Sequence, residues 1–457
     1  MNRRRSRRGT DGVRRIFSDH AYGPAPAAEN FWASRIPDAR LMRPPLTGDK
    51  RADVAVIGAG FTGLSAALHL AQAGAEVVVL DAQHPGWGAS GRNGGFCCLG
   101  GAKADGAEIA RRHGTAARDD WHRTEVAAIA LVEDLLRRHA IAADRHSSGE
   151  TVLAHNRRAM NALVARAGTI AEAYGVVPIL HDKADLQNRG MAGPFLGGMT
   201  TPLGFALDPR AYIAGLTDAA EAAGARIHGT SPVLRIDSDA RGHSLSSPGG
   251  QLRAARLILA TNGYSADDLP PWMAGRYMPA QSNVLVTRPL TLAEQSAGGW
   301  TSDQMAYDSR NLLHYFRLMP DGRFLFGRRG GLLSSPAADR RAIRATRAHF
   351  DRMFPAWSHV ETPFNWSGMV CLAPDLTPYC GPIPDRAGAY AGFAYHGNGV
   401  AMASHTGALL ADLALDRKPQ RPYPQVMQLA PGRFPLGRWR RTLMPAAYAM
   451  AGLADLR

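Results

Sequence analysis

The sequence predicts an α/β protein in which a Rossmann-like β-α-β unit is joined to a second, α+β domain with a mainly antiparallel sheet. Between residues 53 and 80, two short apolar runs flank a glycine-rich turn and a helical stretch, which is typical of parallel strands joined by a helix. Between residues 281 and 331, short segments of alternating aromatic and polar residues indicate antiparallel strands. A chain of 457 residues with 45% hydrophobic and 20% charged residues has a globular composition and is long enough for two domains.

The β-α-β unit comprises a strand at 53–57, a helix at 61–73 and a second strand at 76–80. Apolar residues at helical spacing predict further helices at 118–139, 156–174, 209–223, 341–354 and 400–413. Shorter apolar runs predict strands at 232–237 and 252–261.

Arginine and lysine are concentrated at the two ends of the chain. Of the formal net charge of +14, residues 1–51 carry +7 and residues 431–457 carry +4, so the middle is close to neutral. We therefore expect a disordered basic arm at 1–28, a basic C-terminal tail at 426–457, and no nucleic-acid partner for the folded body. No uninterrupted apolar stretch of about 20 residues occurs, so no membrane span is predicted.

The four cysteines predict neither a disulfide framework nor a metal site. Two of them, Cys97 and Cys98, are adjacent, and no pair has the spacing of a zinc site. A reducing, cytoplasmic setting follows from this cysteine usage. The adjacent pair is best interpreted as small core residues, because neighbouring cysteines form only a strained bridge.

A glycine fingerprint stands between the first strand and the first helix. Gly58, Gly60 and Gly63 match G-x-G-x-x-G, in which the glycines permit a tight turn, a close approach to a pyrophosphate and close helix–strand packing. The start of the helix then offers free N–H groups to the anion. Asp81 ends the second strand, where a carboxylate accepts hydrogen bonds from ribose hydroxyls. The pattern predicts a dinucleotide site.

A second glycine-rich loop, 86–95 (GWGASGRNGG), follows Asp81. Together with 53–65 (DVAVIGAGFTGLS), 260–264 (ATNGY) and 395–399 (YHGNG), it resembles the D-amino-acid oxidase superfamily of flavoproteins, and more narrowly its γ-glutamylputrescine oxidoreductase-like branch. The resemblance extends over about residues 30–441. It implies FAD as cofactor and the FAD fold of the D-amino-acid oxidase and glutathione reductase type.

The resemblance also implies the domain limits and the cofactor residues. The FAD-binding domain is expected to comprise 50–112, 203–270 and 365–425, and the substrate domain 113–202 and 271–364. A glycine loop at the start of the helix from Val400 is expected to stabilise the negative charge that develops at the edge of the reduced flavin. The expected cofactor-binding residues are Gly58, Gly60, Phe61, Thr62, Asp81, Ala82, Ser90, Gly91, Arg92, Asn93, Gly94, Gly95, Val233, Gly263, Gly397, Asn398, Gly399 and Val400.

Departures from related sarcosine oxidases bear on the substrate and the cofactor linkage. Those enzymes hold a substrate carboxylate with two cations, whereas Gly399 and the stretch 96–99 stand at the corresponding positions here. An unpaired carboxylate is costly to bury, so an amine distant from any carboxylate is favoured. Gly368 stands at the flavin-attachment position, which predicts noncovalent FAD. Leu325 stands where those oxidases have an oxygen-activating lysine, so the electron acceptor is either O2 or another molecule.

Several residues are candidates for the substrate pocket. Aromatic residues could form a wall that accepts an amine, and on alternating strands about half of them must point into the core instead. The catalytic residues are unknown; His396 and Tyr315 are the candidates, and Tyr315, Arg317 and Phe326 are candidates for substrate contact. The aromatic candidates are Tyr307, Tyr315, Phe316, Phe324 and Phe326.

The resemblance implies FAD-dependent oxidation of an amine C–N bond, with hydride transfer to flavin N5 and hydrolysis of the imine. A γ-glutamylputrescine-type or other N-substituted amine is the first interpretation of the substrate. A sarcosine-like N-methyl amino acid is the alternative. A flavin-binding protein without turnover is the alternative from another class.

Overall fold

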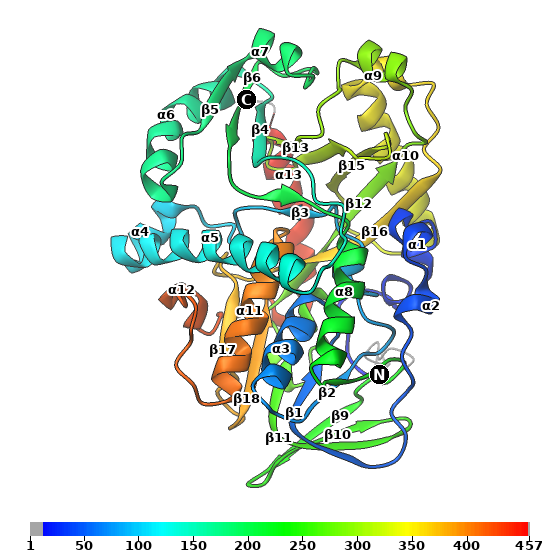
Figure 1. Ribbon diagram of the computed structural model, residues 1–457, viewed down its shortest axis with the longest axis vertical. Helices are drawn as coiled ribbons and strands as arrows, with labels where there is room; N and C mark the ends of the chain where they lie inside the picture. The colour runs from blue at the N-terminus through cyan, green and yellow to red at the C-terminus, as the bar shows by residue number, and fades with distance from the viewer. Residues whose placement is uncertain (1–11, 456–457) are drawn as a thin grey trace, which may run out of the picture.

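The computed structural model describes residues 12–455, whose frame consists of two eight-stranded sheets, one above the other in Figure 1. In the lower sheet, β1 lies between β2 and β11 and is parallel to both, so the carboxyl ends of these strands meet at one edge. In spatial order its strands are β17 (Tyr379–Pro382), β18 (Ala389–Phe393), β11 (Gly250–Leu259), β1 (Lys50–Ile57), β2 (Val77–Leu80) and β8 (Arg226–His228), with β9 (Arg235–Asp239) and β10 (Gly242–Ser247) continuing beside β11.

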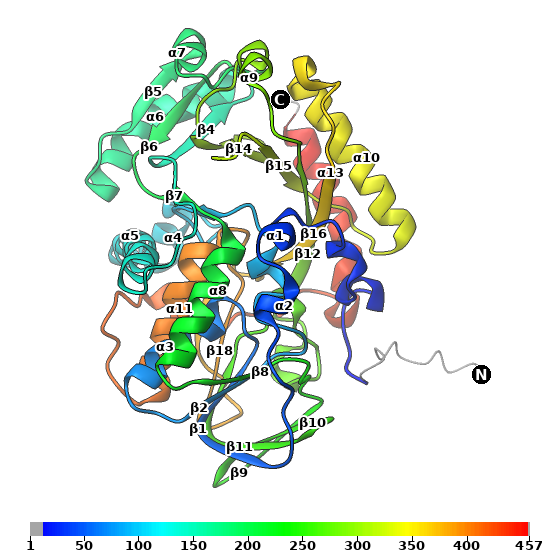
Figure 2. The ribbon, with the colours of Figure 1, turned by 45° about the vertical axis from the view of Figure 1, so that its right-hand side comes forward.

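Three helices cover one face of this sheet. The helix α3 (Phe61–Gln72) packs between α8 (Pro209–Ala222) and α11 (Gly399–Ala414), side by side in Figure 2. Gly407 permits a close contact between α11 and α3, because a Cβ there would lie 2.3 Å from the carbonyl oxygen of Thr62. The helix α5 (Thr115–Arg138) packs across α11. As expected for a central parallel strand, all four residues of β2 are buried.

The upper sheet is antiparallel except where β13 runs parallel to β4. The face of this sheet that α10 (Pro336–Met353) covers is an aromatic core that includes Trp300, Phe316, Phe324 and Trp357. In spatial order its strands are β16 (Phe364–Leu372), β12 (Met278–Val286), β15 (Phe324–Arg329), β14 (His314–Leu318), β13 (Met305–Asp308), β4 (Glu150–Ala154), β6 (Gly197–Thr201) and β5 (Ile179–Asp182).

Shorter elements complete the described chain. A two-stranded ribbon, β3 (Phe96–Cys97) with β7 (Phe205–Ala206), lies between the two sheets. The other helices are α1 (Phe31–Arg35), α2 (Asp38–Leu41), α4 (Gly106–His113), α6 (Arg157–Tyr174), α7 (Lys183–Asn188), α9 (Leu292–Gly298), α12 (Gln425–Gln428) and α13 (Met444–Ala454), with 3-10 turns η1 (Asp19–Tyr22), η2 (Ala25–Ala27), η3 (Ala89–Gly91), η4 (Asn262–Tyr264), η5 (Pro271–Met273), η6 (Pro355–Trp357) and η7 (Gly437–Leu443).

The predicted fold class is confirmed, with differences at two boundaries. Residue 365, predicted to begin a segment of the FAD domain, lies inside β16, which pairs along its whole length with β12 of the upper sheet. The strand predicted at 232–237 begins only at Arg235, and Pro232 and Val233 before it line a cavity. The predicted helices correspond to α5, α6, α8, α10 and α11, of which α5 and α10 begin earlier than expected.

The expectation of a disordered arm at 1–28 is wrong for residues 12–28; residues 1–11 lie outside the described chain. The segment 12–28 packs on the body through Phe17 and Tyr22, which form a buried cluster with Met369 of β16. His20 also binds Asp339 of α10, with Nε2 2.6 Å from the carboxylate. The sequence analysis inferred disorder from the basic composition of this segment and did not consider its apolar residues.

The C-terminal segment 426–457 is likewise folded as far as it is described. Arg440 is fully buried, pairs with Asp267 at 2.7 Å and donates through Nε to the carbonyl of Tyr277. At the end of α13, the Asp455 carboxylate accepts hydrogen bonds from the backbone N–H groups of Asn311 and Leu312. Arginines in this segment therefore serve as internal anchors.

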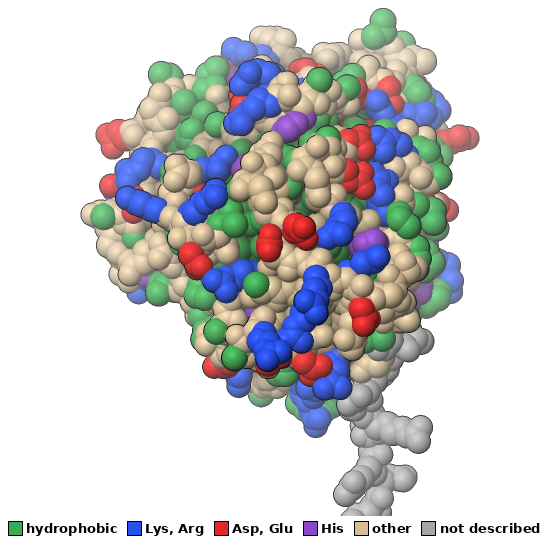
Figure 3. Space-filling view, turned by 60° about the horizontal axis from the view of Figure 1, so that its bottom comes forward, with side chains coloured by type: hydrophobic (Ala, Val, Ile, Leu, Met, Phe, Trp, Pro, Cys, Tyr) green, Lys and Arg blue, Asp and Glu red, His purple; other side chains and the backbone are tan. Residues whose placement is uncertain are grey.

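Basic side chains elsewhere are balanced by acidic ones. Figure 3 shows the lower face, where Lys and Arg are interspersed with Asp and Glu. Arg253 pairs with Asp239 and Arg256 with Asp416. Within residues 12–455, no helix combines the length and apolar character needed to cross a bilayer, and no three His, Cys, Asp or Glu side chains are grouped as a metal site.

Removing the buried guanidinium should destabilise the fold. We expect Arg440→Leu to lower the free energy of unfolding by about 3 kcal/mol, because Asp267 loses its partner. Thermal unfolding of the purified protein measures this effect. Arg438→Leu, an exposed arginine two residues earlier, is the control and should change stability by less than about 0.5 kcal/mol. Equal effects of the two substitutions would contradict the anchoring role.

Candidate active site

A cavity of about 590 Å³ is lined by residues of both sheets. The lower sheet contributes the turn after β1, the end of β2 and the segment after β11. The upper sheet contributes residues 368–371 of β16 and a second group, Ser282, Tyr307, Leu313, Tyr315 and Arg329, which we call the second-sheet wall. The volume is that of a typical small-molecule or cofactor site.

The glycine turn is shaped by close backbone contacts. Gly58 has φ +101° and its N–H donates to the carbonyl of Leu80 at 2.9 Å. A Cβ at Gly63 would lie 1.8 Å from the carbonyl oxygen of Gly58, and one at Gly60 would lie 2.8 Å from Oγ of Ser90. Glycine at these positions therefore lets α3 begin directly beside the cavity, with its N-terminus open to an anion.

Asp81 holds this turn as well as lining the cavity. Its carboxylate accepts hydrogen bonds from the backbone N–H groups of Ala59 at 2.7 Å and Gln83 at 2.8 Å. Burial raises the pKa of the carboxyl. The predicted contact with a ribose stays a prediction, while the structure shows that Asp81 ties the end of β2 to the glycine turn.

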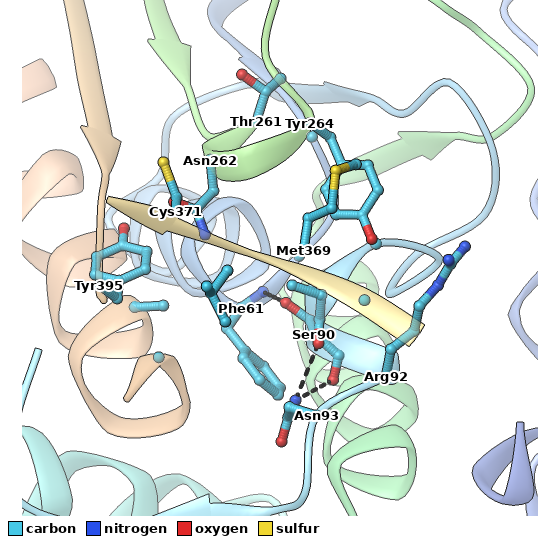
Figure 4. A pocket seen from close by; sticks show the side chains of 18 of the residues that line it. Phe61, Ser90, Arg92, Asn93, Thr261, Asn262, Tyr264, Met369, Cys371 and Tyr395 are labelled. Carbon is cyan, nitrogen blue, oxygen red and sulfur yellow. Dashed lines mark hydrogen bonds between the residues drawn. The ribbon is translucent and has the colours of Figure 1, made fainter. Parts of the chain in front are cut away.

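The second glycine-rich loop is fixed by its own side chains (Figure 4). Ser90 Oγ accepts from the N–H of Phe61 at 3.0 Å, which joins this loop to the start of α3. Asn93 donates to the carbonyls of Ala89 and Ser90 and accepts from the N–H of Gly95. The loop is thereby held along the cavity before any ligand is added.

Two buried polar atoms of the cavity wall lack a hydrogen-bond partner among the described residues. They are Nη2 of Arg92 and the hydroxyl of Tyr264. The Arg92 guanidinium is positioned over the Trp87 ring at 4.1 Å and donates through Nε to the Trp87 carbonyl. Such atoms are expensive to bury unpaired, so a polar cofactor here would satisfy both.

The predicted role of His396 as a catalytic group is not supported by its contacts. Its Nε2 accepts from the N–H of Ala373 at 3.1 Å, so that Nδ1 donates to the carbonyl of Gly101 at 3.0 Å. Burial lowers the pKa of the ring to about 4. His396 therefore lines the cavity as a neutral ring that holds together the segments around residues 101, 373 and 396.

Tyr315, the other catalytic candidate, also lines the cavity. It lies on β14, and its hydroxyl is 3.0 Å from Oγ of Ser282. A Cβ at Gly94 or at Gly327 would collide with its ring, so both glycines make room for it. The next residue, Phe316, points into the aromatic core, as expected from strand alternation.

Arg329, at the end of β15, lines the cavity and was missed by the sequence analysis. Its Nη2 donates to the carbonyl of His396 at 3.0 Å, and no acidic side chain of residues 12–455 forms an ion pair with it. Burial lowers the pKa of this guanidinium. The sequence analysis considered only Gly399 and the stretch 96–99 as positions for a carboxylate-binding cation, whereas Arg329 of β15 brings a guanidinium to the cavity wall.

Other predicted residues do not line the cavity. Arg317 is 1% exposed and donates to the carbonyl of Leu207 and to His146. Phe326 lies in the aromatic core, and Leu325 is buried against Trp32 and Trp366. The alternation of side chains along a strand and the packing against residues far away in the sequence put these three side chains outside the cavity. No local sequence motif indicates either effect. The predicted glycines Gly91, Gly95 and Gly263 pack against backbone, with a Cβ meeting the carbonyl oxygens of Gly86, Leu207 and Val370, respectively.

The remaining predicted cofactor residues line the cavity. They are Gly58, Gly60, Phe61, Thr62, Asp81, Ala82, Ser90, Arg92, Asn93, Gly94, Val233, Gly397, Asn398, Gly399 and Val400. Their contacts with FAD stay predictions. The sequence analysis missed five further lining residues in the N-terminal segment, namely Val13, Arg15, Asp19, Tyr22 and Gly23. Their only signal was a pair of aromatic residues in a basic, low-complexity stretch.

All four cysteines are free and buried. Cys98 and Cys371 line the cavity, whereas Cys97 and Cys380 do not. Burial raises the pKa of the Cys371 thiol to about 12 and raises that of Cys98 well above its usual value. These thiols are therefore protonated at neutral pH.

Comparison with known proteins identifies the family. The family described as FAD dependent oxidoreductase matches residues 53–413, most of the chain. The chain belongs to this family. The probable oxidoreductase OrdL of Haemophilus influenzae is 30% identical over 391 residues, which is 84% of this chain and 87% of that protein. The gamma-glutamylputrescine oxidoreductase of Escherichia coli is 29% identical, covering 87% and 91% of the two chains.

The same fold is found in a solved structure. Glycine oxidase from Geobacillus kaustophilus superposes with a TM-score of 0.67 at 21% identity, over 81% of this chain and 96% of that one. Our protein is thus an FAD-dependent oxidoreductase. The residues present fit the cofactor, because the glycine turn, Arg92 and Tyr264 leave open backbone and unpaired polar atoms beside the cavity.

The contact between Gly63 and Gly58 should be essential for cofactor binding. We expect Gly63→Ala to abolish FAD binding, since its methyl group would displace the carbonyl of Gly58. The flavin-to-protein absorbance ratio after purification measures this loss. Gly168→Ala, inside α6 with no atom near its Cβ position, makes the same substitution without a clash and should retain full flavin content, with stability raised by up to about 1 kcal/mol.

Proposed function

We propose that the protein oxidises the C–N bond of an amine, with a γ-glutamylputrescine-type or other N-substituted amine as substrate. The observation that carries this proposal is the second-sheet wall, which places Tyr307 and Tyr315 in the same cavity as the glycine turn. Aromatic rings beside a cofactor site can receive an amine through hydrophobic and cation–π contact. The similarity to gamma-glutamylputrescine oxidoreductase over most of both chains supports the same substrate class.

In this proposal the chain orients the substrate and excludes water. Bound FAD supplies the hydride acceptor. Tyr315, held by Ser282 and Phe96, presents a fixed ring and hydroxyl to the substrate. The N-terminus of α11, which begins at Gly399, provides a positive dipole beside the cofactor.

An amino acid with its carboxylate near the reacting amine is the second candidate substrate. Arg329 favours it, because a guanidinium in the cavity wall that forms no ion pair with residues 12–455 can bind a carboxylate through charged hydrogen bonds. Glycine oxidase of Geobacillus kaustophilus is 26% identical over about half of this chain, and its name indicates an amino acid as substrate. The same arginine could bind the carboxylate of a γ-glutamyl group, so it serves both candidates.

We further propose noncovalent FAD in a cytoplasmic enzyme. Cys371 is the cavity cysteine nearest in sequence to the expected attachment position, and its pKa of about 12 keeps the thiolate needed for attachment scarce. Four free, buried cysteines are those of a protein from a reducing compartment. Release of the flavin by acid precipitation would test the first point.

Anaerobic mixing with a panel of amines tests the function. We expect γ-glutamylputrescine or a related amine to bleach the flavin absorbance, and air to restore it at a rate that distinguishes an oxidase from a dehydrogenase. Stronger bleaching by sarcosine or glycine would favour the second candidate. No bleaching by any amine or amino acid would contradict the proposed function.

The role of Arg329 has its own prediction. We expect Arg329→Met to weaken binding of carboxylate-bearing amines by about 10- to 100-fold, as for loss of a charged hydrogen bond, with little effect on amines that lack a carboxylate. The substrate dependence of anaerobic flavin reduction measures this difference. Arg328→Met, which removes the preceding arginine of β15 outside the cavity wall, is the matched control.

A further inference from the structure

Two buried carboxyl groups lie behind the cavity, and nothing in the function described above uses them. Glu125 of α5 is 6% exposed and Glu150, the first residue of β4, is 5% exposed. No arginine, lysine or histidine of residues 12–455 forms an ion pair with either. Burying a carboxyl group without a cation lowers the stability of a protein, so two such groups close together suggest a functional role.

The two acids differ in what surrounds them. Glu125 is satisfied, because the hydroxyl of Tyr174 donates to it at 2.6 Å and the backbone N–H of Gly100 also binds it. Glu150 is not, because its Oε2 atom has no hydrogen-bond partner in the described part of the chain. Of the two carboxyl groups, only that of Glu150 therefore has an oxygen that can still accept a hydrogen bond.

Glu150 is connected to the cavity by two residues that line it. The thiol of Cys98 hydrogen-bonds the Glu150 carboxyl. Tyr307 of the second-sheet wall lies on the same face of the sheet as Glu150, because Glu150 pairs with Met305, two residues before Tyr307 on the neighbouring parallel strand β13. The vacant carboxylate oxygen thus lies behind the stretch of the cavity wall that Cys98 and Tyr307 form.

We propose that Glu150 binds the protonated amino group of the substrate beside Cys98 and Tyr307, and so makes the site selective for cationic amines. The proposal rests on the proposed function for the kind of ligand. An ammonium group offers three N–H donors, of which one can occupy Oε2 of Glu150 while the charge offsets the buried carboxylate. The Tyr307 ring adds a face to the same cation.

The acid–base properties of the cluster give the binding a definite pH dependence. Burial, with a further contribution from Glu125, raises the pKa of Glu150 to about 8. The groups that face it are Cys98 beside β3, Glu125 of α5 and Tyr307 of β13, with Tyr174 and Arg166 of α6 beyond them. An ammonium ligand prefers the ionised carboxylate, so its affinity should rise as the pH increases through about 8.

The test uses tert-butylammonium, which has no hydrogen on the carbon bonded to nitrogen and therefore cannot be oxidised. Binding to the purified FAD-containing protein is followed by perturbation of the flavin spectrum and by the thermal unfolding midpoint. We expect the wild-type protein to bind this cation about 10-fold more tightly at pH 8.5 than at pH 6.5. Neutral tert-butanol should show no such dependence. Equal affinity for the cation at both pH values would overturn the proposal without any variant.

Variants locate the effect. Glu150→Gln keeps the shape of the side chain and should weaken tert-butylammonium binding at pH 8.5 at least 10-fold while removing its pH dependence; Glu150→Asp should restore part of both. Glu125→Gln is the matched control and should keep the pH dependence, with its midpoint lowered because the charge that raises the pKa of Glu150 is gone. Unchanged cation affinity in Glu150→Gln would overturn the proposal.

The outcome for Glu150 is separable from that of the proposed function. If amines bleach the wild-type protein and Glu150→Gln with the same substrate dependence, Glu150 does not bind the amine and the proposed function stands. If no amine bleaches the flavin but tert-butylammonium binds in a Glu150-dependent manner, the cation site stands and the proposed reaction fails.

Discussion

The organisation of the cavity depends on the contact of a few glycines with backbone carbonyls around α3. Gly63 lets the helix start against the carbonyl of Gly58, and Gly407 brings α11 down onto Thr62. These contacts set α3 between α8 and α11, and so bring the N-termini of α3 and α11 to the same cavity. Because interiors are close-packed, a single added methyl group here cannot be absorbed locally.

The sequence predicted those parts of the molecule that local chemistry encodes. The fingerprint at residues 58–63 and the loop at 86–95 both line the cavity, as the sequence predicted. They could be predicted because their function needs glycine at several nearby positions in the sequence. By contrast, Arg317 and Arg329 are both arginines of upper-sheet strands, and no local signal distinguishes the one buried against Leu207 from the one in the cavity wall. That difference is decided by pairing between strands far apart in the sequence, which a single sequence does not reveal.

Charge was the least reliable guide at the ends of the chain. Arginine-rich composition is typical of disordered arms, yet Arg440 is fully buried and Asp455 caps a loop of the upper sheet. Inside the molecule the opposite situation holds, because Arg329 and Glu150 have no ionic partner among the described residues. A buried guanidinium and a buried carboxyl group that both lack an ionic partner near one cavity are characteristic of a binding site, whose ligand completes the pairing.

The N-terminal segment has a consequence for how the holoprotein is assembled. Residues 13–23 and residues 395–403 lie near opposite ends of the sequence, and both form part of the same cavity wall. During synthesis the glycine turn emerges early, but the wall around it is complete only when the last strands and α11 have been made. Full enclosure of the cavity therefore requires the chain to be made at least as far as α11, and until then the growing chain offers FAD only an incomplete site.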